Sequence, residues 1–343
     1  EKNLLKNNQF VPDPKPLLRI LKINGKIFIF GAYKKSCALY PYSNGKLDKN
    51  NAITFKINNA LAVSAGDVRK NGLTDLVFAA KDSLGGQECS WYYPQINGTW
   101  PETQRVPIKS YRANDIVLTD LGGKNLSLVI MQSNIITSYD GSTLLYKEFT
   151  GRETLLNDVP VKLPCGDARM ILTPRMQKHC QLVLPHTRTG NATGLLPVVV
   201  YTGKDGKFAL DRKIEFMANG AMDGVFADLD DNGYPDIIIA NEVEMSPHLN
   251  DGSYIYFQNR NGFEKTPLKL PTQFATGIVV ADFNKDGVLD IVFTSLGNEL
   301  TMYYGLDNRQ FKRHDIKLGK GCQTLWLACA PAGKTSIWTV IWI

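Results

Sequence analysis

Two short acidic loops carry the side chains of this sequence that are best suited to bind a metal ion. Both follow the pattern Asp-x-Asp/Asn-x-Asp/Asn-Gly-x-x-Asp, which places oxygen atoms at positions 1, 3, 5 and 9. The side chains are Asp228, Asp230, Asn232 and Asp236 in one loop, and Asp282, Asn284, Asp286 and Asp290 in the other. Ca²⁺ takes about six to eight oxygen ligands, and a backbone carbonyl near position 7, from Tyr234 or Val288, is expected to add one. The pattern therefore predicts one calcium ion in each loop, because uncompensated carboxylates this close repel one another.

A third loop of the same kind departs from the pattern at its third position. It retains Asp67, Asn71 and Asp75, but Arg69 stands where an oxygen ligand is needed. A guanidinium group can replace a metal ion by pairing with carboxylates. We expect Arg69 to pair with Asp67 and Asp75, and we expect no calcium in this loop.

Each loop lies between two apolar segments, and this unit recurs along the whole chain. Aligning the segments places loop starts near residues 22, 67, 120, 173, 228, 282 and 328, at intervals of about 45 to 55 residues. The interval suits one four-stranded antiparallel blade. The sequence thus predicts an all-β fold, a seven-bladed β-propeller that forms a single domain over residues 1–343. A β-sandwich whose turn spacing arose by chance is the alternative.

Polar turns late in each unit support the same fold, since Asn-Gly and Asp-Gly favour hairpin turns. They are expected between the third and fourth strands, at Asn44-Gly45, Asn97-Gly98, Asp140-Gly141, Asp205-Gly206, Asn261-Gly262 and Asn308-Arg309. A seventh such turn, Asn7-Asn8, lies near the N-terminus, whereas the last unit ends after its second strand. Residues 1–16 are therefore expected to complete the last blade and close the ring, which removes an exposed sheet edge.

The loops and their flanking strands resemble the FG-GAP/VCBS repeat family, whose repeats form the integrin α-subunit propeller and many extracellular propellers. The resemblance covers essentially the whole chain and is specific in units two, five and six. It implies a seven-bladed propeller with calcium on the loops between first and second strands. Members act in adhesion, carbohydrate binding and scaffolding, and some are enzymes, so the fold does not choose among these functions.

Composition narrows the classes of partner. The net charge is +6 and no block of Lys/Arg is present, which argues against nucleic-acid binding. No apolar run of about 18 residues occurs, so membrane insertion is not expected.

The chain lacks an initiator Met and a signal peptide, so we expect it to be a mature or trimmed fragment. The resemblance implies a secreted, cell-surface or periplasmic location. The six cysteines permit about 15 pairings, among which the sequence does not choose.

Three functions remain open at this level. The first is a binding or adhesion module for a glycan or protein, with ligand contacts in uneven polar loops on the face opposite the ions. Its candidate residues are Lys81, Asp82, Glu88, Arg188, Asn241, Glu242, Glu244 and His248. The second is a propeller-fold enzyme such as a polysaccharide lyase, which is the less favoured since no catalytic motif is present. The third is a scaffold domain of a larger surface protein. Trp91 fits either the core or a sugar-binding platform.

Overall fold

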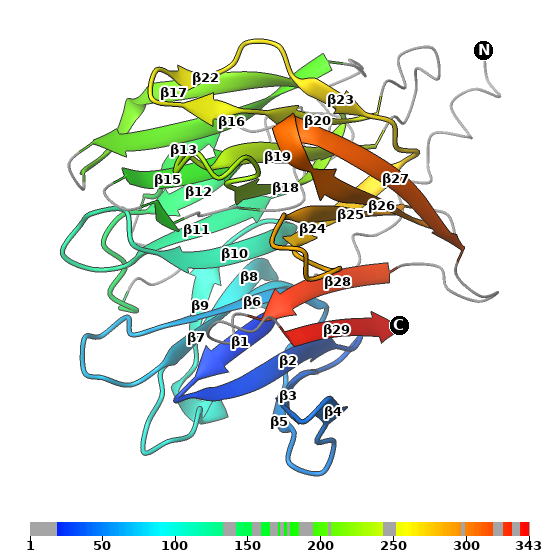
Figure 1. Cartoon of the computed structure of the whole chain (residues 1–343). Coiled ribbons are helices and arrows are strands. Elements are labelled where there is room, and N and C mark those ends of the chain that lie inside the picture. The colour runs from blue at the N-terminus through cyan, green and yellow to red at the C-terminus, as the bar shows by residue number, and fades with distance from the viewer. Residues whose placement is uncertain are drawn as a thin grey trace, which may run out of the picture.

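A computed structural model describes most of the chain as a series of antiparallel β-sheets (Figure 1). The described residues are 19–132, 142–152, 159–164, 171, 175–176, 179–184, 195–204, 207–242, 252–295, 299–317, 325–330 and 337–342. The sheets follow one another in chain order, from the blue N-terminal strands to the red C-terminal ones.

The first three sheets contain strands β1 to β13. The first sheet comprises β1 (Ile20–Ile23), β2 (Lys26–Ala32), β3 (Cys37–Ser43), β4 (Lys46–Leu47) and β5 (Ile53–Phe55). The second comprises β6 (Ala60–Gly66), β7 (Asp75–Leu84), β8 (Gln87–Tyr93) and β9 (Val106–Lys109). The third comprises β10 (Ala113–Thr119), β11 (Ser127–Gln132), β12 (Ser142–Tyr146) and β13 (Val161–Pro164).

The later sheets contain strands β14 to β29. The fourth comprises β14 (Arg175–Met176), β15 (His179–Leu184), β16 (Leu195–Lys204) and β17 (Lys207–Asn219). The fifth comprises β18 (Ala221–Ala227), β19 (Asp236–Asn241), β20 (Ser253–Tyr256) and β23 (Leu268–Leu270), with a ribbon of β21 (Gln258–Asn259) and β22 (Gly262–Phe263) between the last two. The sixth comprises β24 (Ala275–Ala281), β25 (Asp290–Ser295), β26 (Glu299–Leu306) and β27 (Gln310–Lys317), and the last β28 (Leu325–Ala330) and β29 (Ile337–Trp342).

The first strands of neighbouring sheets lie against one another, which is the arrangement of a propeller. Contacts join β1 to β6, β6 to β10, β18 to β24, and β24 to β28. The prediction of an all-β propeller is confirmed at this level.

Apolar side chains fill the space between each pair of neighbouring sheets. Alternate residues of one strand face opposite sides, so Leu76 and Phe78 of β7 pack toward the first sheet, while Val77 and Ala79 pack toward the third. Similar clusters lie between the third and fourth, fourth and fifth, and fifth and sixth sheets. Burial on both faces explains why the second strand of each unit is a continuous apolar run.

The number of complete blades differs from the prediction. Among the described residues, five sheets have four strands, not seven. In the first sheet, β4 and β5 both pair with β3 and occupy two halves of one interrupted fourth strand. The interruption is a turn in which Asp48 accepts the backbone N–H groups of Asn50 and Asn51. The last sheet has two strands, and residues 1–16, predicted to complete it, lie outside the described residues.

One predicted turn is misplaced. Asp140-Gly141 was expected after the third strand of its unit, but Ser142–Tyr146 is itself the third strand, β12. The connection that follows β12 contains Glu148 and Gly151, which both have positive φ angles. The prediction exchanged the two connections of this sheet because Leu144, an apolar residue, also follows an Asp-Gly pair in the sequence.

Side chains of the first strands hold neighbouring sheets together by accepting backbone N–H groups. Leu118 donates to Ser64 Oγ at 3.0 Å, Ile171 donates to the carboxylate of Asp115 at 2.7 Å, and Ile278 donates to that of Asp223 at 2.9 Å. Each bond joins one sheet to the next. Asp115 also accepts a hydrogen bond from Arg19 Nη2 at 2.5 Å, and this bond joins the segment before β1 to the third sheet.

Candidate metal centre

The three acidic loops share one hydrogen-bonded framework, because the same residue types stand at positions 1, 6 and 9 of each loop. The position 1 carboxylates of Asp67, Asp228 and Asp282 each accept the backbone N–H groups of positions 5 and 6. Position 4 has a positive φ in all three loops, and position 6 is a glycine with φ between 78° and 91°. Only glycine adopts such a conformation at little cost, which accounts for its place in the pattern.

The position 9 aspartates anchor the loops to the third strand of their sheets. Asp75, Asp236 and Asp290 are fully buried, at 0% exposure. Each accepts a backbone N–H from the third strand or the residues after it: from Gln95, Gln258 and Gly305. These carboxylates fix the loop geometry through hydrogen bonds to the backbone.

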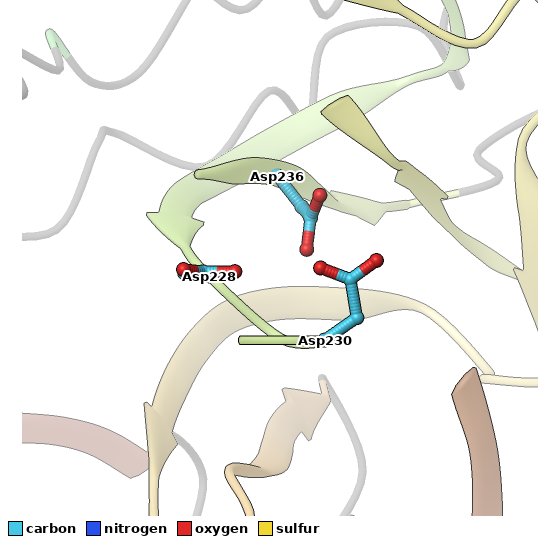
Figure 2. Close-up of side chains that lie close together, drawn as sticks. All are labelled: Asp228, Asp230 and Asp236. Atoms are coloured by element: carbon cyan, nitrogen blue, oxygen red, sulfur yellow. The ribbon is translucent and has the colours of Figure 1, made fainter. Parts of the chain in front are cut away.

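The fifth-sheet loop gathers three carboxylates around one small space (Figure 2). One oxygen each of Asp228, Asp230 and Asp236 lies within 4.8 Å of the others, and this is the only such group among the described residues. Oδ1 of Asp230 is buried and accepts no hydrogen bond, and the same is true of the side-chain oxygen of Gln258. Burying an unpaired carboxylate oxygen is costly, and a cation would satisfy it.

Electrostatics of this loop also favour a cation. Burial raises the pKa of Asp236 to about 6, the negative charges of Asp230 and Asp228 add to the rise, and the N–H groups of Gln258 and Leu229 oppose it. A bound divalent ion reverses such a shift because it favours the ionised form. The residues present therefore fit calcium. The predicted carbonyl ligand of Tyr234 stays a prediction, as does the amide oxygen of Asn232, which already accepts the N–H of Tyr234.

Arg309 reaches this loop from the neighbouring sheet. Its Nε and Nη2 each lie 2.7 Å from Oδ2 of Asp230, and its Nη1 lies 2.7 Å from Oε1 of Glu264. The guanidinium carbon lies 4.2 Å from the centre of the Phe257 ring. In the sequence, the Asn308-Arg309 turn indicates only a strand boundary, and nothing local links it to a carboxylate 79 residues away.

The sixth-sheet loop satisfies its polar side chains within itself. Asn284 donates to Asp286 at 2.7 Å, and Asp286 accepts the N–H of Val288 at 2.8 Å. Asp290 accepts the N–H groups of Phe283 and Asn284. Its carboxylates are not among the groups of three that the described residues bring together, so calcium coordination by Asp282, Asn284, Asp286, Asp290 and the Val288 carbonyl stays a prediction.

Arg69 pairs with the position 9 aspartate of the second-sheet loop. Its Nε and Nη2 bond both oxygens of Asp75 at 3.1 and 2.8 Å, and Nη2 bonds the Gln95 carbonyl at 2.6 Å. The predicted pairing with Asp75 is confirmed. Asp67 contributes only its nearby negative charge, the smallest of the causes that raise the pKa of Arg69, while the bond to Asp75 is the largest.

Solved structures with the same fold extend over most of this chain. A crystal structure of BBS1N in complex with ARL6DN matches with a TM-score of 0.51 and 10% identity, and covers 91% of this chain and 84% of that one. The structure of the Dos1 propeller matches with a TM-score of 0.52 and 12% identity, and covers 90% of this chain and 71% of that one. At these identities the likeness establishes the fold alone.

Residues 228–293 match the family model described as FG-GAP-like repeat. The match begins at the first aspartate of the fifth-sheet loop and ends in β25, so it includes both predicted calcium loops. The chain is a β-propeller whose residues 228–293 carry FG-GAP-like repeats. The predicted family resemblance is thereby confirmed. Comparison with curated protein sequences gave no match.

Several residues predicted to bind ligand are engaged inside the propeller. Asp82 is 5% exposed and accepts hydrogen bonds from Trp91 Nε1 and Asn58 Nδ2, both at 2.8 Å. Asn241 is 1% exposed and donates to the Gly252 carbonyl, and Glu242 is 4% exposed. These three side chains are buried in this structure, and their contact with a ligand stays a prediction.

The remaining candidates divide into two groups. Lys81 and Glu88 are partly exposed at a β-hairpin, and Glu88 accepts the N–H of Arg112. This hairpin replaces the loop predicted over residues 81–88, because β7 and β8 continue to a two-residue Gly85-Gly86 turn. Arg188, Glu244 and His248 lie outside the described residues.

Trp91 belongs to the core. It is 3% exposed, it packs in the cluster between the first two sheets, and Arg105 lies over its ring at 4.0 Å. The two cysteines whose side chains are described, Cys37 and Cys89, are buried free thiols in the same cluster. Burial raises the pKa of Cys89 to about 11. No described helix is long and apolar enough to cross a membrane.

A cavity of about 400 Å³ opens beside the second-sheet and third-sheet loops of the propeller. Asp67 and Lys70 line it from one loop, and Asp120 and Lys124 from the other. Leu118 and Leu126 supply apolar surface, and Asn125 adds an amide. Sequence reasoning missed this cavity because it is formed by two loops that have lost the calcium pattern and looked like degenerate copies.

Proposed function

We propose that this FG-GAP propeller is an extracytoplasmic, calcium-stabilised binding module for a glycan or protein partner. Calcium would bind in the fifth-sheet and sixth-sheet loops and brace the propeller. The observation that carries the calcium proposal is the buried, unpaired Oδ1 of Asp230 among three converging carboxylates. An ion that binds only the folded state stabilises it in proportion to the logarithm of its concentration.

The same proposal includes a ring of seven blades. The five-stranded and two-stranded sheets would be the first and seventh blades, the latter completed by residues 1–16. Val292, Leu300 and Met302 of the sixth sheet support this, since they form an apolar cluster on the side away from the fifth sheet. Contacts of β24 and β25 with β28 continue the series of sheets beyond the sixth.

The cavity between the second and third sheets is the candidate ligand contact. Its volume of about 400 Å³ falls within the usual range of ligand pockets. Each wall offers one carboxylate and one ammonium group, and these groups suit sugar hydroxyls, which both donate and accept hydrogen bonds. The balanced charge favours a neutral glycan over a highly charged polymer. This cavity lies beside the acidic loops, whereas a ligand on the opposite face stays an untested prediction.

A glycan array tests the binding function. We expect the unaltered protein to bind neutral glycans, and both Lys124→Ala and Asp120→Asn to reduce binding about tenfold, the loss expected from one or two hydrogen bonds. Lys46→Ala, which removes an exposed lysine from β4, serves as the matched control and should bind normally.

The outcomes of this array separate the parts of the proposal. An array with no bound glycan would reject the glycan partner and leave a protein partner to be tested. Binding that both cavity variants retain would reject the cavity as the contact. In a chelator, binding should persist below the unfolding temperature and disappear at lower temperatures than in calcium, because the ions act through stability.

A further inference from the structure

We propose that Arg309 sets the calcium affinity of the fifth-sheet loop. Its positive charge weakens binding of the ion by Asp228, Asp230 and Asp236, and it stabilises the loop when no ion is bound. This inference rests on the proposed calcium site and assigns a regulatory group to it. Arg309 belongs to the sixth sheet, so the site would be controlled from the neighbouring blade.

The position of Arg309 is held by several contacts. Its side chain bonds Asp230 and Glu264 and lies over Phe257, and all three partners belong to the fifth-sheet unit. Its backbone, together with that of Asn308, has a φ of 59°, a conformation that an arginine adopts infrequently. The turn between β26 and β27 thus directs this side chain across the boundary between two sheets.

The guanidinium group uses only one oxygen of Asp230. Both of its contacts, through Nε and Nη2, are to Oδ2, and Oδ1 remains buried and unpaired. Asp230 can therefore bind an ion through Oδ1 while Arg309 stays in place. A positive charge on the far oxygen of a ligand carboxylate repels the ion and weakens the carboxylate as a donor. Without the ion, the same charge offsets the repulsion among the three aspartates.

The other two acidic loops differ from the fifth-sheet loop in whether an arginine pairs with their carboxylates. In the second-sheet loop, Arg69 bonds the position 9 aspartate directly and fills the place of an ion. Among the described contacts of the sixth-sheet loop, Asp282, Asp286 and Asp290 accept hydrogen bonds from backbone and amide groups, and no arginine pairs with them. The fifth-sheet loop is intermediate. It should bind calcium more weakly than it would without Arg309.

The test is a calcium titration by calorimetry on chelator-treated protein with Asp282→Ala as the background, so that the fifth-sheet site is measured by itself. Arg309→Gln should tighten binding about tenfold, and Arg309→Lys, which retains the charge, should leave it within about threefold. Arg313→Gln is the matched control, since Arg313 lies on β27, is exposed and pairs with Asp315 away from the loop. It should leave the affinity unchanged.

Thermal unfolding supplies a second readout, the rise in melting temperature on addition of calcium, which a purely structural role would not change. In chelator, Arg309→Gln should melt below the unaltered protein, because the pairing with Asp230 and Glu264 is lost. Its rise in melting temperature on addition of calcium should be larger than that of the unaltered protein. An unchanged or weaker affinity in Arg309→Gln would overturn this inference alone. Absence of calcium binding in the unaltered protein would instead overturn the proposed calcium site.

Discussion

At the scale of single residues, Asp223 is a buried carboxyl group that joins two neighbouring sheets by hydrogen bonds. This carboxyl is 8% exposed on β18 and accepts the N–H groups of Gly224 and of Ile278 in the next sheet. Burial raises its pKa to about 7, backbone hydrogen bonds and Arg19 oppose the rise, and Asp115 adds to it. No other charged group is among the causes of this shift.

The raised pKa makes stability depend on pH. Between its ordinary pKa of 3.8 and about 7, the folded state binds the Asp223 proton more tightly than the unfolded state does. Stability from this group is therefore complete below pH 4 and falls as pH rises toward 7. Urea unfolding at several pH values should show that the unfolding free energy of Asp223→Asn rises relative to that of the unaltered protein from pH 4 to pH 8, because asparagine does not ionise. A difference between the two proteins that stays constant with pH would contradict the assignment.

Residue spacing predicted the aspartates of the fifth-sheet loop and the pairing of Arg69, but it did not predict the contact of Arg309. The predicted ligands Asp228, Asp230 and Asp236 are eight residues apart at most, so a tight loop brings them together whatever the rest of the chain does. Arg69 was predicted to pair with Asp75 for the same reason. Arg309 was missed, because its contact depends on how two sheets pack and leaves no local pattern.

At the scale of elements, the connections between sheets are as constrained as the strands. Gly220 links β17 to β18 with a φ of 65°, and a Cβ there would lie 2.1 Å from the Glu242 carbonyl oxygen. The two residues are joined by a 2.8 Å hydrogen bond from Glu242 N–H to the Gly220 carbonyl. Close backbone approach and a positive φ both require glycine at this position.

A pair of alanine variants separates these two requirements. Gly45, in the turn between β3 and β4, has a φ of 77° and nothing within 4 Å of its missing Cβ. Gly45→Ala should cost about 1 kcal/mol in unfolding free energy through backbone strain alone. Gly220→Ala should cost about 2 kcal/mol more, because the carbonyl must move. Equal losses in chemical denaturation would show that the connection yields without cost.

Strands were predicted correctly where burial of both faces requires apolar residues. The prediction failed where a polar side chain is buried because its hydrogen-bond partner lies far away in the sequence. The run Leu76–Phe78 is apolar because both of its faces are covered, and such runs marked the second strand of each unit. The polar run from Lys81 to Glu88 was predicted as a loop, yet it forms a hairpin. Asp82 is buried there because Trp91 and Asn58 donate to it, which the sequence does not reveal.

At the scale of the whole molecule, the repeat was the most informative feature of the sequence. A unit of about 50 residues cannot bury both faces of its sheet alone, so neighbouring units must stack. The described sheets share one apolar cluster at each boundary from the first to the sixth. Interrupted strands such as β4 and β5 depend on local turn chemistry, which the repeat does not encode.

The position of bound ions tests most directly the proposal that calcium binds in two loops of this propeller while an arginine stands in a third. Crystals equilibrated with calcium would be measured for anomalous scattering. We predict one ion among Asp228, Asp230 and Asp236, one in the loop of Asp282 and Asp290, and none at Asp75, where the Arg69 guanidinium lies. Absence of an ion from the fifth-sheet loop, or an ion bound at Asp67 and Asp75, would contradict the account.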